Sequence, residues 1–401
     1  MQQAPPQLKK TLGPLSLWGL GVGYVISGEY FGWNLGLPLA GSLGMLLATL
    51  LVTLMYAGFA LGYAELACAL PRAGGAFVYT TRAYGRRVGS IAGVAQLIEF
   101  TLAPPAIALA IAAYVTQRYP ALDTRGVALA TYVVFSALNA WGVRQAARFE
   151  LFVTVLAVLE LLLFACVALP HFELAAFRRD ALPHGIGGAF AALPFAIWFY
   201  LGIEGVANAA EESENPQRDV AFGFVAALGT LVALALLVFF SAVGVSGWHA
   251  VVYPPGSSEP SDAPLPLALA QVVSSSSALY SLLLGIGMLG LIASFHGILL
   301  ASARTTMELG RAGFAPSILG RVHARSGTPR VALLVNMLLG ALAILSGRTA
   351  DIITLSVLGA LLMYVLALSS LFHLRRTEPR LKRPFLTPLY PFLPALSLAV
   401  A

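Results

Sequence analysis

Runs of about twenty or more apolar residues follow one another along almost the whole chain, with most charges confined to the short loops between them. Such a run is long enough to cross the hydrocarbon core of a bilayer as one helix. Of the 401 residues, 58% are hydrophobic and only 10% are charged, whereas soluble domains carry about 25% charged residues. So few charges cannot cover a water-facing surface. The sequence therefore predicts an all-α integral membrane protein surrounded by lipid bilayer.

Ten of these runs are expected to cross the membrane within a single transmembrane domain over residues 1–401. An eleventh begins near Pro388, and the chain stops inside it at Ala401, so we expect a truncated chain. The expected spans are 13–38, 44–70, 88–116, 126–143, 150–170, 187–209, 220–246, 275–309, 330–347 and 351–372, with 388–401 as the start of the eleventh.

The basic residues predict the orientation. Most Lys and Arg residues lie in the loops on the same side as the N-terminus, and cytoplasmic loops are enriched in these residues. We therefore expect a multi-pass protein of the cytoplasmic (inner) membrane with its N-terminus in the cytoplasm. The net charge of +6 is spread over short loops, so it indicates no nucleic-acid partner. Nothing in the sequence indicates the oligomeric state.

The cysteines and histidines predict neither a metal site nor a disulfide framework. Cys68 and Cys166, the two cysteines, both lie inside apolar runs. The six histidines are scattered along the chain without the spacing of a ligand set. No cofactor is expected.

The first and sixth spans are interrupted by residues that favour helices poorly, Ser27-Gly28 in the first and Gly202 and Gly205 in the sixth. The second break comes five helices after the first, an odd number, so two five-helix halves, 13–170 and 187–372, would run in opposite directions across the membrane. Glycine-interrupted spans at matching positions of two halves indicate a transporter binding site. Glycine also allows close packing of membrane helices, so one break alone is weaker support than the pair.

Three stretches resemble the amino acid–polyamine–organocation transporter superfamily: 21–32, 63–85 and 199–219. The first reads Gly-Val-Gly-Tyr-Val-Ile-Ser-Gly-Glu-Tyr-Phe-Gly and is similar to the unwound first helix of that family. Segments 12–28, 30–38 and 99–107 resemble the ethanolamine permeases in particular. The resemblance implies a LeuT-like fold of two inverted five-helix repeats with broken helices one and six, an amine substrate and a proton-motive mechanism. Relatives usually complete twelve helices, whereas this chain ends in the eleventh.

Acidic residues inside the expected spans are the main candidates for function, because ionisable groups in hydrocarbon cost several kcal/mol. Glu29 lies at the first break, where amino-acid carriers of the superfamily hold the carboxylate of the substrate. A carboxylate side chain at that place would repel another. The expected ligand is therefore a small cationic amine without a carboxyl group. The alternative is that Glu29 points into the extracellular vestibule and is merely solvated.

Glu204 lies in the second break, one turn after the aromatic residues Trp198, Phe199 and Tyr200. An ammonium held between a carboxylate and an aromatic face gains Coulomb energy and about 2 kcal/mol of cation–π energy in a dry site. Alternatively, Glu204 is a protonated acid bonded to free backbone groups, and the aromatic rings pack against lipid or core. The expected substrate-binding residues are Ser27, Gly28, Glu29, Tyr30, Glu99, Phe100, Trp198, Phe199, Tyr200, Gly202 and Glu204.

Glu99 precedes Phe100 and the proline pair at 104–105. Prolines free the carbonyls one turn earlier, and a buried acid beside them can bind and release a proton. A similar Glu-aromatic pair occurs in cationic amino-acid carriers of the superfamily. Ala157 stands where some proton-coupled relatives hold a Lys, so sodium dependence stays open beside a proton gradient. Glu99 and Glu160 could also be neutral structural acids. The candidates for proton coupling are Glu99, Glu204 and Glu160.

Other classes of function fit the sequence less well. Gly21-x-Gly23 opens no strand–helix unit, so it is no dinucleotide signature, and no catalytic cluster is recognisable. A channel requires a continuous polar path. We therefore expect a secondary active transporter, not an enzyme, that imports ethanolamine or a related alkylamine by alternating access. A proton-coupled amino acid permease is the close alternative, and an integral-membrane enzyme is the alternative from another class.

Overall fold

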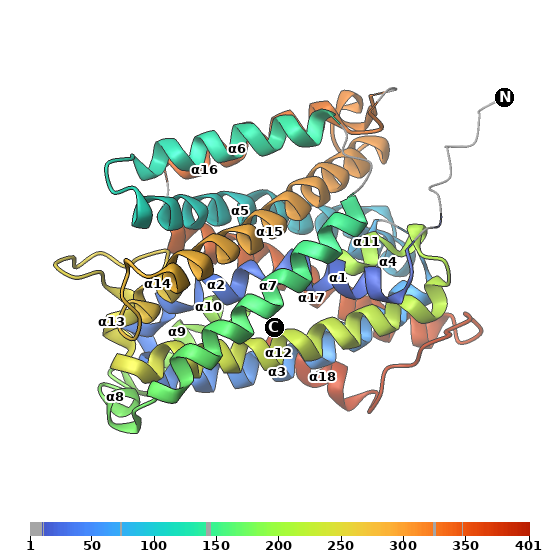
Figure 1. The fold of residues 1–401 in the computed structure, drawn as a ribbon. Helices are drawn as coiled ribbons and strands as arrows, with labels where there is room; N and C mark the ends of the chain where they lie inside the picture. The colour runs from blue at the N-terminus through green and yellow to red at the C-terminus, as the bar shows by residue number, and fades with distance from the viewer. Residues whose placement is uncertain (1–9, 11, 73, 142–145, 324–325, 347) are drawn as a thin grey trace.

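The computed structural model of the chain shows helices packed side by side, as expected from the apolar runs (Figure 1). It describes residues 10–401 except 11, 73, 142–145, 324–325 and 347. Within those residues the structure contains no strand, only an isolated bridge between Leu12 and Ser213. In this described part of the chain, six helices are long and apolar enough to cross a membrane. The prediction of a multi-pass helical membrane protein is confirmed.

The helices follow the expected spans closely. The ends of two expected spans, at residues 143 and 347, lie outside the described residues. The long helices are α3 (Leu37–Ala69), α5 (Arg86–Arg118), α6 (Thr124–Trp141), α7 (Ala146–Ala168), α12 (Pro216–Ser246), α15 (Ala278–Arg311), α16 (Arg330–Ser346) and α17 (Thr349–Thr377). The shorter ones are α1 (Pro14–Val25), α2 (Ser27–Tyr30), η1 (Trp33–Gly36), α4 (Gly75–Tyr84), η2 (Leu169–His171), α8 (Leu174–Arg178), α9 (Gly185–Ala191), α10 (Leu193–Ile197), α11 (Gly205–Asn208), η3 (Ala210–Glu212), α13 (Trp248–Val252), α14 (Pro264–Leu269), η4 (Ser317–Gly320) and α18 (Phe392–Val400).

The first expected span is interrupted on either side of Ser27-Gly28, but both of these residues lie inside the short helix α2, and the backbone becomes extended only at Phe31 (φ −163°, ψ 175°). Helix α1 ends at Val25, and α2 begins at Ser27. The outer part of this span continues through η1 into the start of α3. Helix α3 is itself bent at Gly41, whose φ of 67° belongs to the left-handed region that glycine tolerates. The first and second expected spans therefore meet at this bend.

The second break is wider than the sequence indicates. Helices α9 and α10 precede it, turns occupy 198–204, and α11 follows. Only short-range backbone bonds hold these turns, such as Ile203 N–H to the carbonyl of Tyr200 at 3.4 Å. Gly202 has a φ of 98°, which a side chain would oppose. The interruption thus begins at the aromatic residues and not at Gly202.

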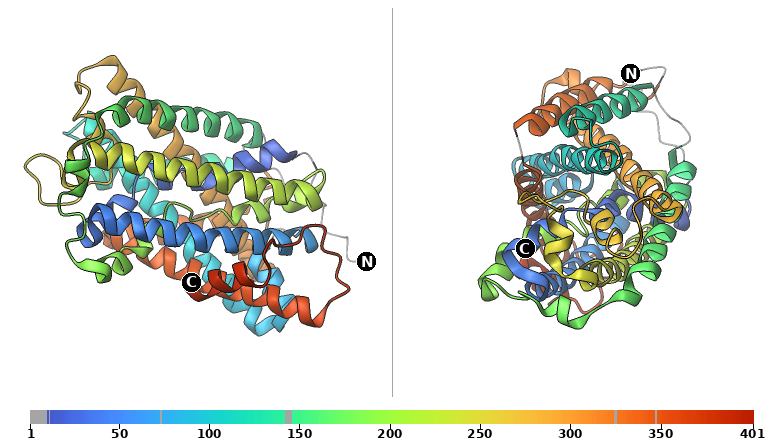
Figure 2. Two further views of the ribbon diagram at one scale, coloured as in Figure 1. Left: turned by 90° about the horizontal axis from the view of Figure 1, so that it is seen from below. Right: turned by 60° about the vertical axis from the view of Figure 1, so that its left-hand side comes forward.

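The two broken segments lie in the middle of the bundle. Helix α1 packs against α7, α12 and α15, while α5 packs against α15 and α17. Helices α6 and α16 lie side by side at one edge (Figure 1). The short helices α8, α9, α13 and α14 gather at the end opposite the N-terminus, as the turned views also show (Figure 2). Both breaks are therefore enclosed by long helices.

At the N-terminal end of the bundle, backbone bonds join the residue before α1 to the segment after the second break. Leu12 donates its N–H to the carbonyl of Glu212 at 3.0 Å, and its own carbonyl accepts from Glu214 N–H at 3.0 Å. Arg304 of α15 also pairs with Glu212 at 3.4 Å. These contacts hold the N-terminal end of α1, the segment after α11 and the C-terminal part of α15 against one another.

A buried carboxylate fastens the C-terminal segment to α3. Glu65 accepts bonds of 2.8 and 2.6 Å from the guanidinium of Arg375 on α17. The backbone N–H and hydroxyl of Thr387 donate to the same carboxylate at 2.8 and 2.7 Å, and Arg383 lies 3.4 Å from it. Glu65 therefore has a structural role in holding α3, α17 and the chain before α18 together.

Candidate functional site

The two breaks touch each other directly. A Cβ at Gly28 would overlap the carbonyl oxygen of Trp198 and lie 3.1 Å from Cα of Phe199. A Cβ at Gly32 would overlap the indole ring of Trp198. Only glycines allow this approach, so the local sequence of the first break fixes its distance from the second. The residues predicted at both breaks are brought together here.

Glu29 is the acidic residue of the first break. Its side chain is 0% exposed, and neither carboxylate oxygen has a hydrogen-bond partner among the described residues. The backbone carbonyl of Glu29 accepts from Trp33 Nε1 at 3.2 Å, which leaves the carboxylate itself free. In this conformation Glu29 is therefore not solvated in a vestibule, and both oxygens of its carboxyl group are free to bond a ligand.

The three predicted aromatic residues point to three different partners. Trp198 meets Phe31 edge to face at 5.5 Å between ring centroids. Phe199 stacks on Trp33 at 5.8 Å with an interplanar angle of 11°. The third, at position 200, packs against Tyr56 at 5.1 Å and shares a hydroxyl bond of 2.7 Å with Thr53. The aromatic residues therefore line several walls instead of forming one lid.

A pair of carboxyl groups joins α5 to the second break. The side chains of Glu99 and Glu204 are 0% exposed and lie close to each other, while both oxygens of Glu99 and Oε1 of Glu204 have no hydrogen-bond partner among the described residues. Tyr364 of α17 donates to Oε2 of Glu204 at 3.3 Å and shares a bond of 2.9 Å with the hydroxyl of Tyr56. Two carboxyl groups can bond only if one is protonated. This pair is therefore a place where a proton can be held.

Phe100, the aromatic neighbour of Glu99, is buried in the hydrophobic core. Sequence reasoning missed Tyr56 and Tyr364, which complete the polar side of the carboxyl pair. Their hydroxyls lie inside long apolar helices, and a tyrosine in that setting usually needs a hydrogen-bond partner. That was the signal from which they could have been identified.

Ser27 and Gly202 contribute mainly to the backbone arrangement of the breaks. The hydroxyl of Ser27 lies 2.8 Å from that of Ser294 on α15, which in turn donates to the carbonyl of Tyr24 at 2.6 Å. A Cβ at Gly205 would overlap the ring of Tyr24. Close packing across α1, α11 and α15 thus surrounds the first break.

Tyr30 and Glu160 form a separate cluster. The hydroxyl of Tyr30 donates to Oε2 of Glu160 at 2.6 Å and lies 3.2 Å from the carbonyl of Ala157. The hydrogen bond of Glu160 is therefore with Tyr30 of the first break and not with Glu99 or Glu204. The side chains of the adjacent residues 29 and 30 therefore lie in different environments.

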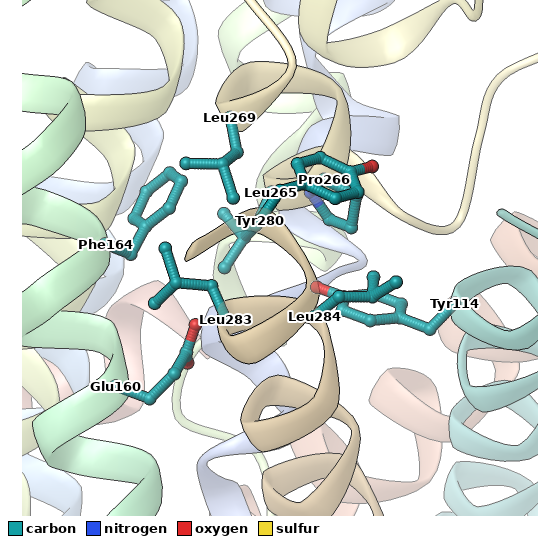
Figure 3. A pocket seen from close by; sticks show the side chains of 9 residues that line it. All are labelled: Tyr114, Glu160, Phe164, Leu265, Pro266, Leu269, Tyr280, Leu283 and Leu284. Carbon is teal, nitrogen blue, oxygen red and sulfur yellow. The ribbon is translucent and has the colours of Figure 1, made fainter. Parts of the chain in front are cut away.

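A small pocket lies beside this second cluster, between α5, α7, α14 and α15 (Figure 3). Glu160 sits at one end of it, below leucine and phenylalanine side chains. The pocket shares no lining residue with the carboxyl pair of α5 and the second break. Its lining residues are Tyr114, Glu160, Phe164, Leu265, Pro266, Leu269, Tyr280, Leu283 and Leu284.

Glu150, near the start of α7, is a buried acid that sequence reasoning did not single out. It is 4% exposed, and its Oε1 has no hydrogen-bond partner in the described part of the chain. Its position at the first residue of the expected span 150–170 made it look like a residue of the loop. In the described ranges, no three His, Cys, Asp or Glu side chains gather as ligands for a metal ion.

Comparisons with known proteins agree with a transport role. A family model described as amino acid permease matches residues 12–401. The chain is 28% identical over 407 residues to an uncharacterized transporter of Rhizobium meliloti (strain 1021), covering 98% of this chain and 85% of that protein. It is 27% identical over 417 residues to a branched-chain amino acid permease of Bacillus subtilis (strain 168), with coverages of 98% and 86%. A vacuolar cationic amino acid transporter of Arabidopsis thaliana is 28% identical over 362 residues, with coverages of 82% and 55%.

Proposed function

We propose that this chain, which belongs to the amino acid permease family, imports a small organic amine such as ethanolamine across the cytoplasmic membrane by alternating access. The family and the names of the matched relatives support a membrane transporter. The proposal includes a LeuT-like arrangement of two inverted repeats, 13–170 and 187–372, with 388–401 outside them and the N-terminus in the cytoplasm. Breaks in the first and sixth spans that touch each other support that arrangement.

The assignment of an amine as the substrate depends on the unpartnered carboxyl group of Glu29. This group is buried at the first break without a hydrogen-bond partner among the described residues. A buried charge without a counter-charge is costly, and an ammonium ligand would supply one. A substrate carboxylate at the same place would add a second negative charge and raise that cost. The site therefore favours cations without an acid group.

The surroundings of Glu29 are consistent with a cationic ligand. Trp33 and Phe199 stack nearby, and aromatic faces attract cations. In the described part of the chain, no Lys or Arg belongs to the fully buried residues. An ammonium would therefore meet carboxyl groups and aromatic rings without a competing positive charge.

The carboxyl pair supplies a separate place for the coupling ion. Glu99 and Glu204 can hold one proton between them, while Glu29 holds the ammonium. Loading both groups on one side and releasing both on the other gives proton symport. Glu160, bonded to Tyr30, is the further candidate for proton transfer. Sodium is the alternative coupling ion, and uptake with and without a sodium gradient distinguishes the two.

The second candidate is an amino acid permease, because two matched relatives are named branched-chain amino acid permeases. In that case the substrate would keep its carboxyl group, and the role of Glu29 would have to be different. The two candidates predict opposite orders of preference between ethanolamine and leucine.

Uptake into proteoliposomes tests the proposal. With an inward proton gradient, uptake of labelled ethanolamine should exceed that of leucine, alanine or arginine by at least about tenfold, the equivalent of one lost ion contact. Glu29→Gln should lower ethanolamine uptake by a similar factor. Glu259→Gln, a change at an exposed loop residue, is the matched control and should leave uptake unchanged. Preference for leucine over ethanolamine would refute the amine assignment.

A further inference from the structure

Helix α1 packs closely against α7 at two glycines of α1. A Cβ at Gly19 would lie 2.7 Å from Cδ1 of Leu151, and one at Gly23 would lie 2.5 Å from Oε1 of Glu150 and 2.7 Å from the hydroxyl of Thr154. That hydroxyl donates to the carbonyl of Gly19 at 3.2 Å. Since the glycines carry no side chains, the carboxyl group of Glu150 lies directly against the backbone of α1.

The same carboxyl group is enclosed from a second side. A Cβ at Gly297 on α15 would lie 3.6 Å from Oε1 of Glu150. That oxygen has no hydrogen-bond partner among the described residues, and the side chain is 4% exposed. An ionised carboxylate in such a place is strongly disfavoured, whereas a protonated one is tolerated. The seam between α1, α7 and α15 therefore suits a neutral acid while it is closed.

The charged and titratable groups nearby are engaged elsewhere. On α15, Arg304 pairs with Glu212 at 3.4 Å, and Nδ1 of His296 lies 3.1 Å from Asn139 Nδ2. On α12, Asp219 accepts from the backbone N–H of Asn215 at 3.2 Å. On α1, the ring of Tyr24 packs against Gly205 and Gly297. None of these described groups forms an ion pair with Glu150.

We propose that Glu150 is a proton-binding site that controls the opening of α1. With α1 against α7, Glu150 carries a proton. When α1 tilts away, water reaches the carboxyl group, and the proton leaves from its oxygen to the solution on the N-terminal side. By linkage, alkaline solution on that side then favours the open arrangement, and acid solution favours the closed one. The inference rests on the alternating-access part of the proposed function but not on the identity of the substrate.

Val206 offers a reporter of this opening. It is 0% exposed, and a Cβ at Gly21 of α1 would lie 2.7 Å from its Cγ2. Movement of α1 would therefore expose position 206. The test uses Val206→Cys in a background in which Cys68 and Cys166 are replaced by serine, and measures maleimide labelling in membranes without any substrate.

The labelling rate is compared at pH 5.5 and pH 8 in proteins that carry either Glu150 or Glu150→Gln. At each pH, the labelling rate of the protein with Glu150 is divided by that of the Glu150→Gln protein, so the titration of the reporter thiol cancels. This quotient should rise at least fivefold from pH 5.5 to pH 8, and Glu150→Asp in place of Glu150 should keep the rise. Glu259→Gln, in an exposed loop, should behave like the protein with Glu150. A ratio that changes less than twofold would overturn the proposal.

A second measurement needs no variant, so it holds even if a substituted protein fails to fold. The rate of backbone hydrogen–deuterium exchange is measured in α1 (residues 14–25) and in the reference helix α6 (residues 124–141). Dividing the first rate by the second cancels the intrinsic pH dependence of exchange. This quotient should rise at least fivefold from pH 5.5 to pH 8, and a flat quotient would overturn the proposal. Because neither readout uses a substrate, failure of the amine assignment in uptake assays leaves this test intact.

Discussion

Replacing Glu65 by glutamine should destabilise the protein strongly, because one buried carboxylate receives polar contacts from both α17 and the C-terminal segment. It receives two bonds from Arg375, at 2.8 and 2.6 Å, and two from Thr387, at 2.8 and 2.7 Å. Arg383 lies 3.4 Å away. Glutamine keeps one acceptor oxygen but removes the charge that both guanidinium groups face.

The burial of the partners sets the size of the effect. The side chain of Glu65 is 1% exposed, while those of Arg375 and Arg383 are 20% and 9% exposed. Breaking a buried ion pair by removing one partner costs about 3–5 kcal/mol. Because Arg375 reaches some solvent once released, we expect a loss near the lower limit, about 3 kcal/mol of unfolding free energy.

Equilibrium unfolding by sodium dodecyl sulfate in mixed micelles measures this loss. Glu308→Gln is the matched control, since Glu308 meets Arg311 at a similar distance of 3.0 Å, but the two side chains are 35% and 45% exposed. An exposed pair of this kind contributes about 0.5 kcal/mol or less. Equal losses for the two variants, or a loss below about 1 kcal/mol for Glu65→Gln, would refute the reasoning from burial.

Two further predictions concern the site and the loop before α14. Gly28→Ala should lower uptake at least about tenfold while the protein still folds, because the new methyl group overlaps the carbonyl of Trp198 and overpacking costs about 1–3 kcal/mol; unchanged uptake would contradict the close contact of the breaks. Burial raises the pKa of Asp262 from 3.8 to about 6, although a bond of 2.6 Å from Thr349 opposes the shift. The folded protein therefore holds this proton more tightly than the unfolded chain, so the contribution to stability is complete in acid and is lost as the pH rises through about 6. Melting temperatures should show this fall, and Asp262→Asn should lack it.

Features encoded within a few neighbouring residues could be predicted from the sequence. Ser27-Gly28 indicates the neighbourhood of the first break, although in the structure both residues lie in α2 and the extended backbone comes at Phe31. Gly202 marks the second, but there the turns already begin at Trp198. Helix propensity is a weak guide to where a helix ends once tertiary contacts act on it. The contact of Gly28 with Trp198 is such a tertiary influence.

Features that depend on packing between distant helices could not be predicted. Nothing in the spacing of Glu99 and Glu204 indicates that their side chains meet, because the pairing is set by how α5 lies against the second break. Glu150 likewise becomes buried only because Gly23 of α1 faces it. Its burial follows from a glycine on another helix, which hydropathy along the chain does not report.

The bonds between Leu12 and the residues around Ser213 have a practical consequence for handling the protein. Leu12 lies just ahead of the first helix, so a truncation that removes Leu12 would also remove these bonds. Labels for mechanistic work are therefore better placed on the exposed loop around Glu259, far from these bonds along the chain.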